Sequence, residues 1–269
     1  MLFRSGYGWA QTAVAQLAVA QNHPSLGLVF MQAHNLFLDL VLWCGIPLGL
    51  LLSAVLIWWL VQKTRKVASA QDAILVLFVG VVGWHAMLEL PLHYAYMLLP
   101  TGLVMGALNF RLAEPVVAHW RRWQFACVVL VAVTLLAVIA RDYLRIEQNF
   151  FVLRFERARI GSKPPEPASS VLLLDHMNEF VRLGRTPARK NMTAQELDWI
   201  RKAAFAFPAL ANVLNLATAL AWNGRTDEAQ ELVKKLQGIA TPPQYDHMRG
   251  IWRNQARDDT ALAAVSWAD

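Results

Sequence analysis

Residues 33–49 read Ala33-His-Asn-Leu-Phe-Leu-Asp-Leu-Val-Leu-Trp-Cys-Gly-Ile-Pro-Leu-Gly49 and open a long apolar run that continues to Leu60. Because about 20 apolar residues are enough to cross a bilayer, the run predicts a membrane-spanning helix. His34 and Asp39 lie near its start. An ionisable group inside a span costs about 2.5–3.5 kcal/mol, so each of these side chains needs a structural or a functional reason.

The charged residues divide the chain of 269 residues into two unlike halves. Residues 1–140 hold 7 of the 25 Lys and Arg residues and 4 of the 19 Asp and Glu residues. The first half therefore has the composition of a membrane domain and the second that of a water-soluble domain. In the second half basic and acidic residues nearly balance, so the net charge of +6 does not indicate a nucleic-acid partner.

Four apolar runs are candidates for transmembrane helices, at about 36–62, 73–92, 94–112 and 123–140. Basic residues gather in the two loops that follow the first and third runs, and by the positive-inside rule these loops are cytoplasmic. They are Lys63, Arg65, Lys66, Arg111, Arg121 and Arg122.

From this topology we expect an all-α, polytopic membrane protein in three parts. In a bacterium with an outer membrane this means the inner membrane, with the external face periplasmic. Residues 1–35 form part of a periplasmic loop with an amphipathic helix, and residues 36–140 form the four-span membrane domain. Residues 141–269 form a small periplasmic helical domain, so that both termini of the chain are periplasmic.

The same topology places the polar residues of the membrane half at its periplasmic face. The candidate site residues are Arg4, His34, Asn35, Asp39, His85, Glu89, His93 and Tyr94. A structural explanation stays open for several of them. Asn35 can cap the first helix and bond Asp39 four residues later, and His34 can be an interfacial histidine.

The spacing His85-xxx-Glu89-xxx-His93 would align three zinc ligands on one face of a helix. Pro91 interrupts that stretch and breaks or kinks the turn that would align them. Helix caps and interfacial hydrogen bonds explain the same side chains equally well. We therefore expect no metal site.

Helical periodicity continues after Arg141. We expect a helix over 141–160, a Pro-rich linker, and helices near 170–184, 194–206, 208–222, 226–238 and 243–265. Asn223-Gly224 is a helix stop and Thr226-Asp227-Glu228 a helix start. The stretch 219–232 resembles the turn of a tetratricopeptide-type hairpin, which favours a domain that docks a partner or substrate; a packed helical cap without a ligand is the alternative.

Four stretches together resemble a known family. They are Gly6-Tyr-Gly-Trp-Ala-Gln11, Ala33–Asp39 with Gly45–Gly49, His85-Ala-Met-Leu-Glu-Leu-Pro-Leu-His-Tyr-Ala-Tyr96, and the Arg-rich helix with its helical tail. The chain resembles the C-terminal portion of the bacterial O-antigen ligase/polymerase superfamily, and most closely its protein O-linked oligosaccharyltransferases. The resemblance implies transfer of a glycan from an undecaprenyl-diphosphate carrier to a protein Ser or Thr hydroxyl or to a lipid A core sugar, with no cofactor.

By this resemblance His34 activates the acceptor hydroxyl, and Glu89 and Tyr94 support it or contact the carrier; His85 and His93 are weaker candidates. Complete members of the family have many more spans, so we expect this chain to be a fragment without the donor-binding half. Two alternatives stay open. One is a non-catalytic four-span membrane protein whose tail docks a partner, and the other is a glycan polymerase.

Overall fold

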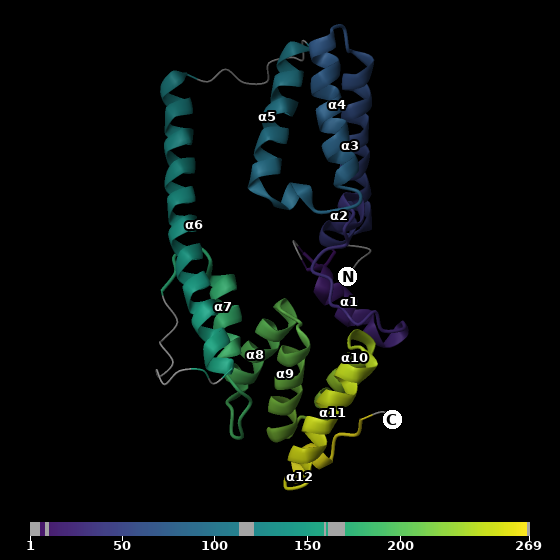
Figure 1. Cartoon of the computed structure of the whole chain (residues 1–269), viewed down its shortest axis with the longest axis vertical. Coiled ribbons are helices and arrows are strands. Elements are labelled where there is room, and N and C mark those ends of the chain that lie inside the picture. Colours follow the sequence, from purple (N-terminus) through teal and green to yellow (C-terminus); the bar gives the residue numbers. More distant parts are fainter. Residues whose placement is uncertain (1–5, 9–10, 113–120, 159, 161–169, 268–269) are drawn as a thin grey trace. The chain divides into compact units, whose positions relative to one another are not determined.

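The computed structural model describes residues 6–8, 11–112, 121–158, 160 and 170–267. Within these ranges the chain is helical and contains no β-strand, which confirms the predicted all-α class (Figure 1). The chain divides into two compact units. The first comprises Met1–Gln16 and Phe30–His119, and the second comprises Leu17–Val29 and Trp120–Asp269. The domain boundaries expected at residues 35 and 140 stay a prediction.

The first apolar run forms two helices, α2 (Leu36–Cys44) and α3 (Ile46–Arg65), which pack against each other. Gly45 separates them with a φ of +82°, a conformation that only glycine adopts at little cost. Pro47 then lies in the first turn of α3, where its missing N–H needs no partner. The single span expected over 36–62 was therefore wrong at its start, because the chain turns at Gly45.

The rest of the first unit is a helical hairpin. α4 (Ala70–His85) is followed by the short 3-10 helix η2 (Pro91–His93) and by α5 (Ala95–Arg111). Ser69 caps α4, since its hydroxyl accepts the N–H of Asp72 at 3.2 Å. The Asp72 carboxylate accepts in turn from Nε of Arg111 at 2.7 Å, which joins the start of α4 to the end of α5.

Two helices in the described ranges are long and apolar enough to cross a membrane, α3 with 20 residues and α6 (Arg122–Arg157) with 36 residues. Their apolar windows are 17% and 0% buried within the protein, unlike the core helix of a soluble protein. α4 and α5 have 16 and 17 residues, fewer than the 20 or so of a typical span. The expected count of four spans therefore stays a prediction.

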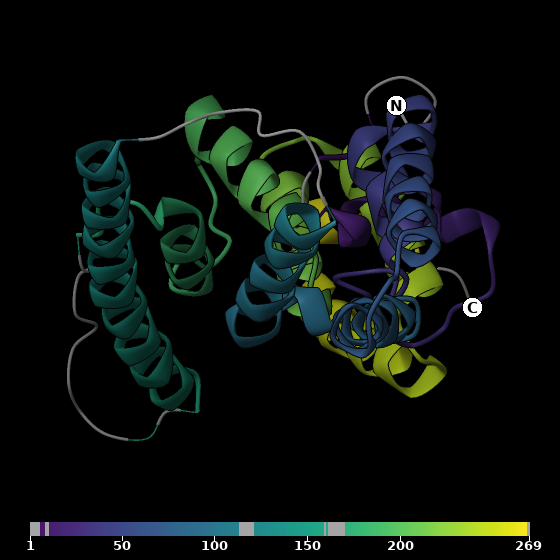
Figure 2. The same ribbon diagram turned by 90° about the horizontal axis from the view of Figure 1, so that it is seen from above.

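In the second unit, α6 continues without a break from its apolar first half into an amphipathic second half. α7 (Asp175–Gly184) packs beside this second half, as Figures 1 and 2 show. Ile146 and Leu153 of α6 and Val181 of α7 are buried between them. The predicted continuation of the fourth apolar run into a tail helix is confirmed.

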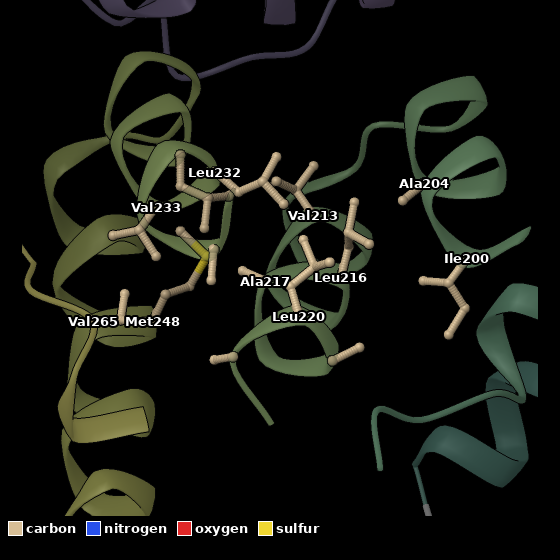
Figure 3. Close-up of a cluster of buried hydrophobic side chains, with 14 of the residues drawn as sticks. Ile200, Ala204, Val213, Leu216, Ala217, Leu220, Leu232, Val233, Met248 and Val265 are labelled. Atoms are coloured by element: carbon tan, nitrogen blue, oxygen red, sulfur yellow. The ribbon is translucent and has the colours of Figure 1, made fainter. Parts of the chain in front are cut away.

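The tail is built from α8 (Ala194–Ala206), α9 (Leu210–Trp222), α10 (Thr226–Ile239), α11 (Pro242–Ala256) and α12 (Thr260–Ala263). Their apolar faces form one core, centred on α9, whose Val213, Leu216 and Ala217 are 0% exposed (Figure 3). The predicted stop at Asn223-Gly224 and start at Thr226 are confirmed.

Two details of the tail depart from expectation. The helix predicted over 243–265 is divided, because α11 ends at Ala256 and the Asp259 carboxylate caps α12 by accepting two backbone N–H groups. The N-terminal segment also contributes to this unit. α1 (Thr12–Val19) leads into η1 (Ala20–Asn22), which packs against α10, and Ser25 Oγ donates to the carbonyl of Ala240 at 2.6 Å.

Asn215 of α9 and Asn223, which directly follows this helix, bind the irregular segment 186–192 that precedes α8. The side-chain oxygen of each accepts a backbone N–H, and its amide nitrogen donates to a backbone carbonyl. Four bonds of 2.7–2.9 Å join Asn215 to Ala188 and Thr186, and Asn223 to Met192 and Arg189. These four bonds hold the segment through its main chain, and Met192 also packs its side chain into the tail core.

Candidate active site

The loop before α2 presents His34 in an unusual conformation. His34 has a φ of +53°, one of two positive values among the described residues that are not glycine. For a residue with a side chain this left-handed conformation costs about 1–3 kcal/mol. The side chain is exposed, so burial of the imidazole does not compensate for the cost. Neighbouring polar groups must hold the loop in place.

Asp39 is the first of these groups. It is 1% exposed, and its Oδ1 accepts the backbone N–H of Ala33 at 2.8 Å and the hydroxyl of Thr12 at 3.3 Å. A buried carboxylate is costly unless it is hydrogen-bonded, and here its bonds fix the residue directly before His34. The sequence suggested that Asp39 bonds the amide of Asn35, and this was wrong, because that amide binds elsewhere.

Asn35 is the second. Its Oδ1 caps α2 by accepting the N–H groups of Phe37 and Leu38, both at 3.1 Å, which confirms the predicted cap. Its Nδ2 donates to the carbonyl of Met87 at 3.2 Å. The backbone N–H of Leu36 also donates to the carbonyl of Ala86, at 2.9 Å. Residues on both sides of His34 are thus tied down, on one side to the turn that follows α4.

These bonds bring His34 next to Glu89. Nδ1 of His34 lies 3.7 Å from Oε2 of Glu89, and the two side chains are 48% and 62% exposed. The separation suits an ion pair but exceeds a hydrogen bond. Catalytic hydrogen bonds are often long before substrate binds. The pair leaves Nε2 of the imidazole available for a ligand, with a carboxylate beside the other ring nitrogen.

The remaining candidates are less closely connected to this pair. The ring of His93 packs edge-on against Trp43, with 5.7 Å between the ring centroids. The rings of Tyr94 and Tyr96 stack with their centroids 5.4 Å apart. His85 is the last residue of α4 and is exposed. α4 ends there and η2 begins at Pro91, so the spacing from His85 to His93 does not form one helix face. Arg4 lies outside the described residues.

Metal ligation has no support in this part of the chain. Within the described ranges, no three side chains of His, Cys, Asp or Glu are placed to share a metal ion.

An apolar cavity of about 290 Å³ adjoins the His34 loop. Leu36 and Phe37, which directly follow the loop, line it together with Met87 from the turn after α4. Side chains of α3, α4 and α5 complete its walls, and most of them are aliphatic or aromatic. The His34–Glu89 pair therefore lies close in sequence to a lining that suits a hydrocarbon chain.

The sequence did not reveal some of the groups that build this site. Thr12 carried no signal beyond its place in a helical pattern, and the carbonyls of Ala86 and Met87 are backbone groups that any residue supplies. Gly6, the first glycine of the stretch Gly6–Gln11, allows a close approach of two backbone segments. A Cβ there would lie 2.4 Å from the backbone nitrogen of Gly45, so only glycine allows this approach to the end of α2.

Comparison with known proteins identifies the family. Residues 73–245, more than half of the chain, match the family model described as the C-terminal part of a virulence factor membrane-bound polymerase. The chain belongs to this family. The matched range contains Glu89, the turn around Pro91 and most of the helical tail, and it begins after His34. Membership also confirms the resemblance to the O-antigen ligase/polymerase superfamily and identifies the chain as a membrane protein.

Two curated relatives of this family member come from Acinetobacter baylyi. A general O-oligosaccharyltransferase is 29% identical over 239 residues, which cover 87% of this chain and 41% of that protein. A ComP-specific O-oligosaccharyltransferase is 38% identical over 104 residues, which cover 39% of this chain and 19% of that protein. The chain thus spans about two fifths and one fifth of their lengths. No solved structure matches the chain significantly.

Proposed function

We propose that the chain transfers a glycan from an undecaprenyl-diphosphate carrier to an acceptor hydroxyl at the periplasmic face of the inner membrane. One observation carries the proposal. An exposed histidine is held in a costly backbone conformation beside a carboxylate, in a chain similar to two O-oligosaccharyltransferases. Strained residues cluster at functional sites, and buried bonds from Asp39 maintain this one.

In this reaction the acceptor oxygen forms a bond to the anomeric carbon of the glycan as the bond from that carbon to the diphosphate breaks. The hydroxyl proton passes to Nε2 of His34, and the diphosphate leaves with the electron pair. Glu89 beside Nδ1 orients the imidazole and stabilises its charged form. The proposal needs no metal and no nucleotide sugar.

The apolar cavity next to the His34 loop is the proposed site for part of the isoprenyl chain of the carrier. Its lining of aliphatic and aromatic side chains suits a hydrocarbon ligand. Leu36 and Phe37 directly follow the loop, so a chain bound there would bring the attached diphosphate near His34. Tyr94, five residues after Glu89, is the proposed contact to the head group of the carrier.

The orientation of the membrane part follows from charge. Lys63 and Arg65 end α3, Arg111 ends α5, and Arg122 begins α6. The His34 loop, by contrast, contacts the turn after α4, at the opposite end of the α4–α5 hairpin from the Asp72–Arg111 pair. If the basic ends are cytoplasmic, the site is periplasmic. With 1.5 Å per residue, α4 and α5 span about 24–26 Å, enough to cross a thin or locally thinned bilayer.

The tail supports a protein acceptor over a lipid A core. α9 and α10 form the proposed tetratricopeptide-like hairpin, and a groove of about 290 Å³ lies along α9 and α11. Trp222 lines the groove, and its indole N–H has no hydrogen-bond partner among the described residues. That N–H is buried, so a polypeptide would cover the apolar wall of the groove, whereas a glycan-only enzyme has no evident use for this surface.

The decisive experiment is the His34→Ala variant, assayed in the natural genetic context of the chain so that any further part of the protein is present. We expect the yield of glycosylated acceptor to fall at least about 100-fold, the scale of a lost general base. The matched control is His247→Ala, which removes an exposed histidine of α11. Wild-type glycosylation in His34→Ala membranes with normal protein levels would refute the proposal.

The non-catalytic alternative gives a different result in the same membranes. A protein partner retained by the tail, with no glycan transfer by the wild-type chain in its natural context, would favour it. Growth of the glycan itself without transfer to protein would favour a polymerase.

A further inference from the structure

The segment 170–174 lies against one side of α6 where the apolar part of this helix ends. The carboxylate of Asp142 is 0% exposed, and its Oδ2 accepts the backbone N–H groups of Leu172 and Leu173, both at 2.7 Å, and that of Leu174 at 3.4 Å. The guanidinium of Arg145 donates to the carbonyl of Ser170 at 3.0 Å. Residues 170–174 are therefore fixed to one side of α6.

This fixation leaves apolar side chains pointing outward. Leu172 is 62% exposed and Leu173 is 49% exposed, although their backbone is bonded to a buried carboxylate. Leu144, two residues after Asp142 and so on the opposite side of the helix, is 62% exposed. Tyr143 lies between these positions around the helix and is 48% exposed. We call these four residues the apolar collar.

The collar lies at a defined distance from the start of the helix. From Arg122 to Arg141 the helix rises about 28 Å, close to the roughly 30 Å thickness of the hydrocarbon core of a bilayer. Residues 142–145 then follow within about 6 Å, a distance that corresponds to the head-group layer. Arg141 and Arg145, one at each end of this layer, suit lipid phosphates.

We propose that the apolar collar inserts into the membrane interface around the exit of α6 and fixes how deep this helix lies and where α7 begins. The occupant of this surface is the bilayer itself, because the collar continues the exposed apolar surface of the span. A water-facing loop would gain nothing from exposing adjacent leucines while burying an aspartate to hold them. The proposal is independent of the transfer reaction.

The test places an environment-sensitive fluorophore (NBD) on single cysteines of the full chain in nanodiscs of phosphatidylcholine and phosphatidylglycerol. Cys44→Ser and Cys127→Ser remove the native thiols, and Leu172→Cys or Leu144→Cys introduces the label. Lys202→Cys on α8, whose side chain is 79% exposed, is the control. Helical circular dichroism identifies variants that fail to fold.

We expect blue-shifted emission at positions 172 and 144 that nitroxide-labelled lipids quench, and neither effect at position 202. Emission at both collar positions equal to that of the control would overturn the proposal. A blue shift without quenching by lipid would also overturn it, since protein would then cover the collar. If one variant misfolds, the other still tests whether the collar inserts, because each label reports on its own side of α6.

Discussion

The helical tail and the membrane part of this chain use apolar residues in opposite ways. In the tail, Leu216 and Leu220 of α9 are 0% and 1% exposed, and the core around them stabilises the fold. In the membrane part, Leu103 of α5 and Leu130 of α6 are 75% and 67% exposed. There a few hydrogen bonds, such as those that Asp39 accepts, hold the loops in place. Burial thus stabilises one region, and sparse hydrogen bonds position the other.

The largest expected effect tests the first half of this comparison. Leu220→Ala should destabilise the tail by about 2–5 kcal/mol, because the surrounding side chains relax only partly into the cavity that the substitution leaves. Hydrogen exchange of the α9 and α10 amides measures the loss. Leu136→Ala, which truncates a leucine of α6 that is 66% exposed, should change protection by less than about 0.5 kcal/mol. Equal effects of the two variants would remove the distinction between the regions.

A substitution of Asp39 tests whether sparse hydrogen bonds position the membrane part. Asp39→Ala leaves the partly buried N–H of Ala33 without its acceptor, a cost of at most about 1–3 kcal/mol. The loop that presents His34 should loosen, and glycan transfer should fall about 10- to 100-fold with the tail unaffected. Asp39→Asn keeps an acceptor oxygen and should lose less. The amount of glycosylated acceptor, together with hydrogen exchange of the tail, separates these outcomes; a loss confined to the tail would contradict the assignment.

A smaller effect is expected at Glu89. Glu89→Gln removes the charge beside Nδ1 of His34 while keeping the shape of the side chain. Both groups are largely exposed and solvent screens them, so transfer should fall only about 3- to 10-fold. The amount of glycosylated acceptor in membranes that hold equal levels of the two proteins measures the loss. Transfer at the wild-type level would show that Glu89 does not act through His34.

The smallest expected effect is an acid dependence of the tail. The hydrogen bond from Lys190, with Nζ 2.5 Å from Oδ2, is the main reason that the pKa of Asp259 lies below its ordinary value of 3.8. A carboxyl whose pKa is lowered by folding stabilises the protein above its unfolded pKa, and this contribution is lost as the pH falls through the folded value. Lys190→Gln should therefore lower the melting temperature of the tail slightly at neutral pH, and the difference should vanish well below pH 3.8. A difference that persists in acid would show a packing role for Lys190 instead.

Local signals made much of the fold predictable. The cap at Asn35, the stop at Asn223-Gly224 and the continuation of the last span into the tail each depend on a few adjacent residues. The break at Gly45 was missed because an apolar run of this length outweighed the glycine and proline within it. The division at Asp259 was missed because that residue caps a helix of only four residues.

The site was predictable only in part. Loop charges placed His34 and Glu89 on one face, and the structure brings them to 3.7 Å. The partners of Asp39 could not be read from the sequence, since Thr12 is 27 residues away and the other donor is a backbone N–H. Long-range bonds to main-chain atoms leave no pattern in the residues that supply them.

Asn215 of α9 and Asn223, directly after this helix, restrict how the segment 186–192 can change. Because Asn215 and Asn223 bind only main-chain atoms, most substitutions in the segment leave their bonds intact. Proline at position 188 or 192 is excluded, since it has no N–H to donate. The spacing between the two attachment points is also fixed, and one inserted residue would put one of them out of register. These four bonds thus tolerate side-chain replacement in the segment but not a change in its length, while Lys190 and Met192 contribute separately through their own side chains.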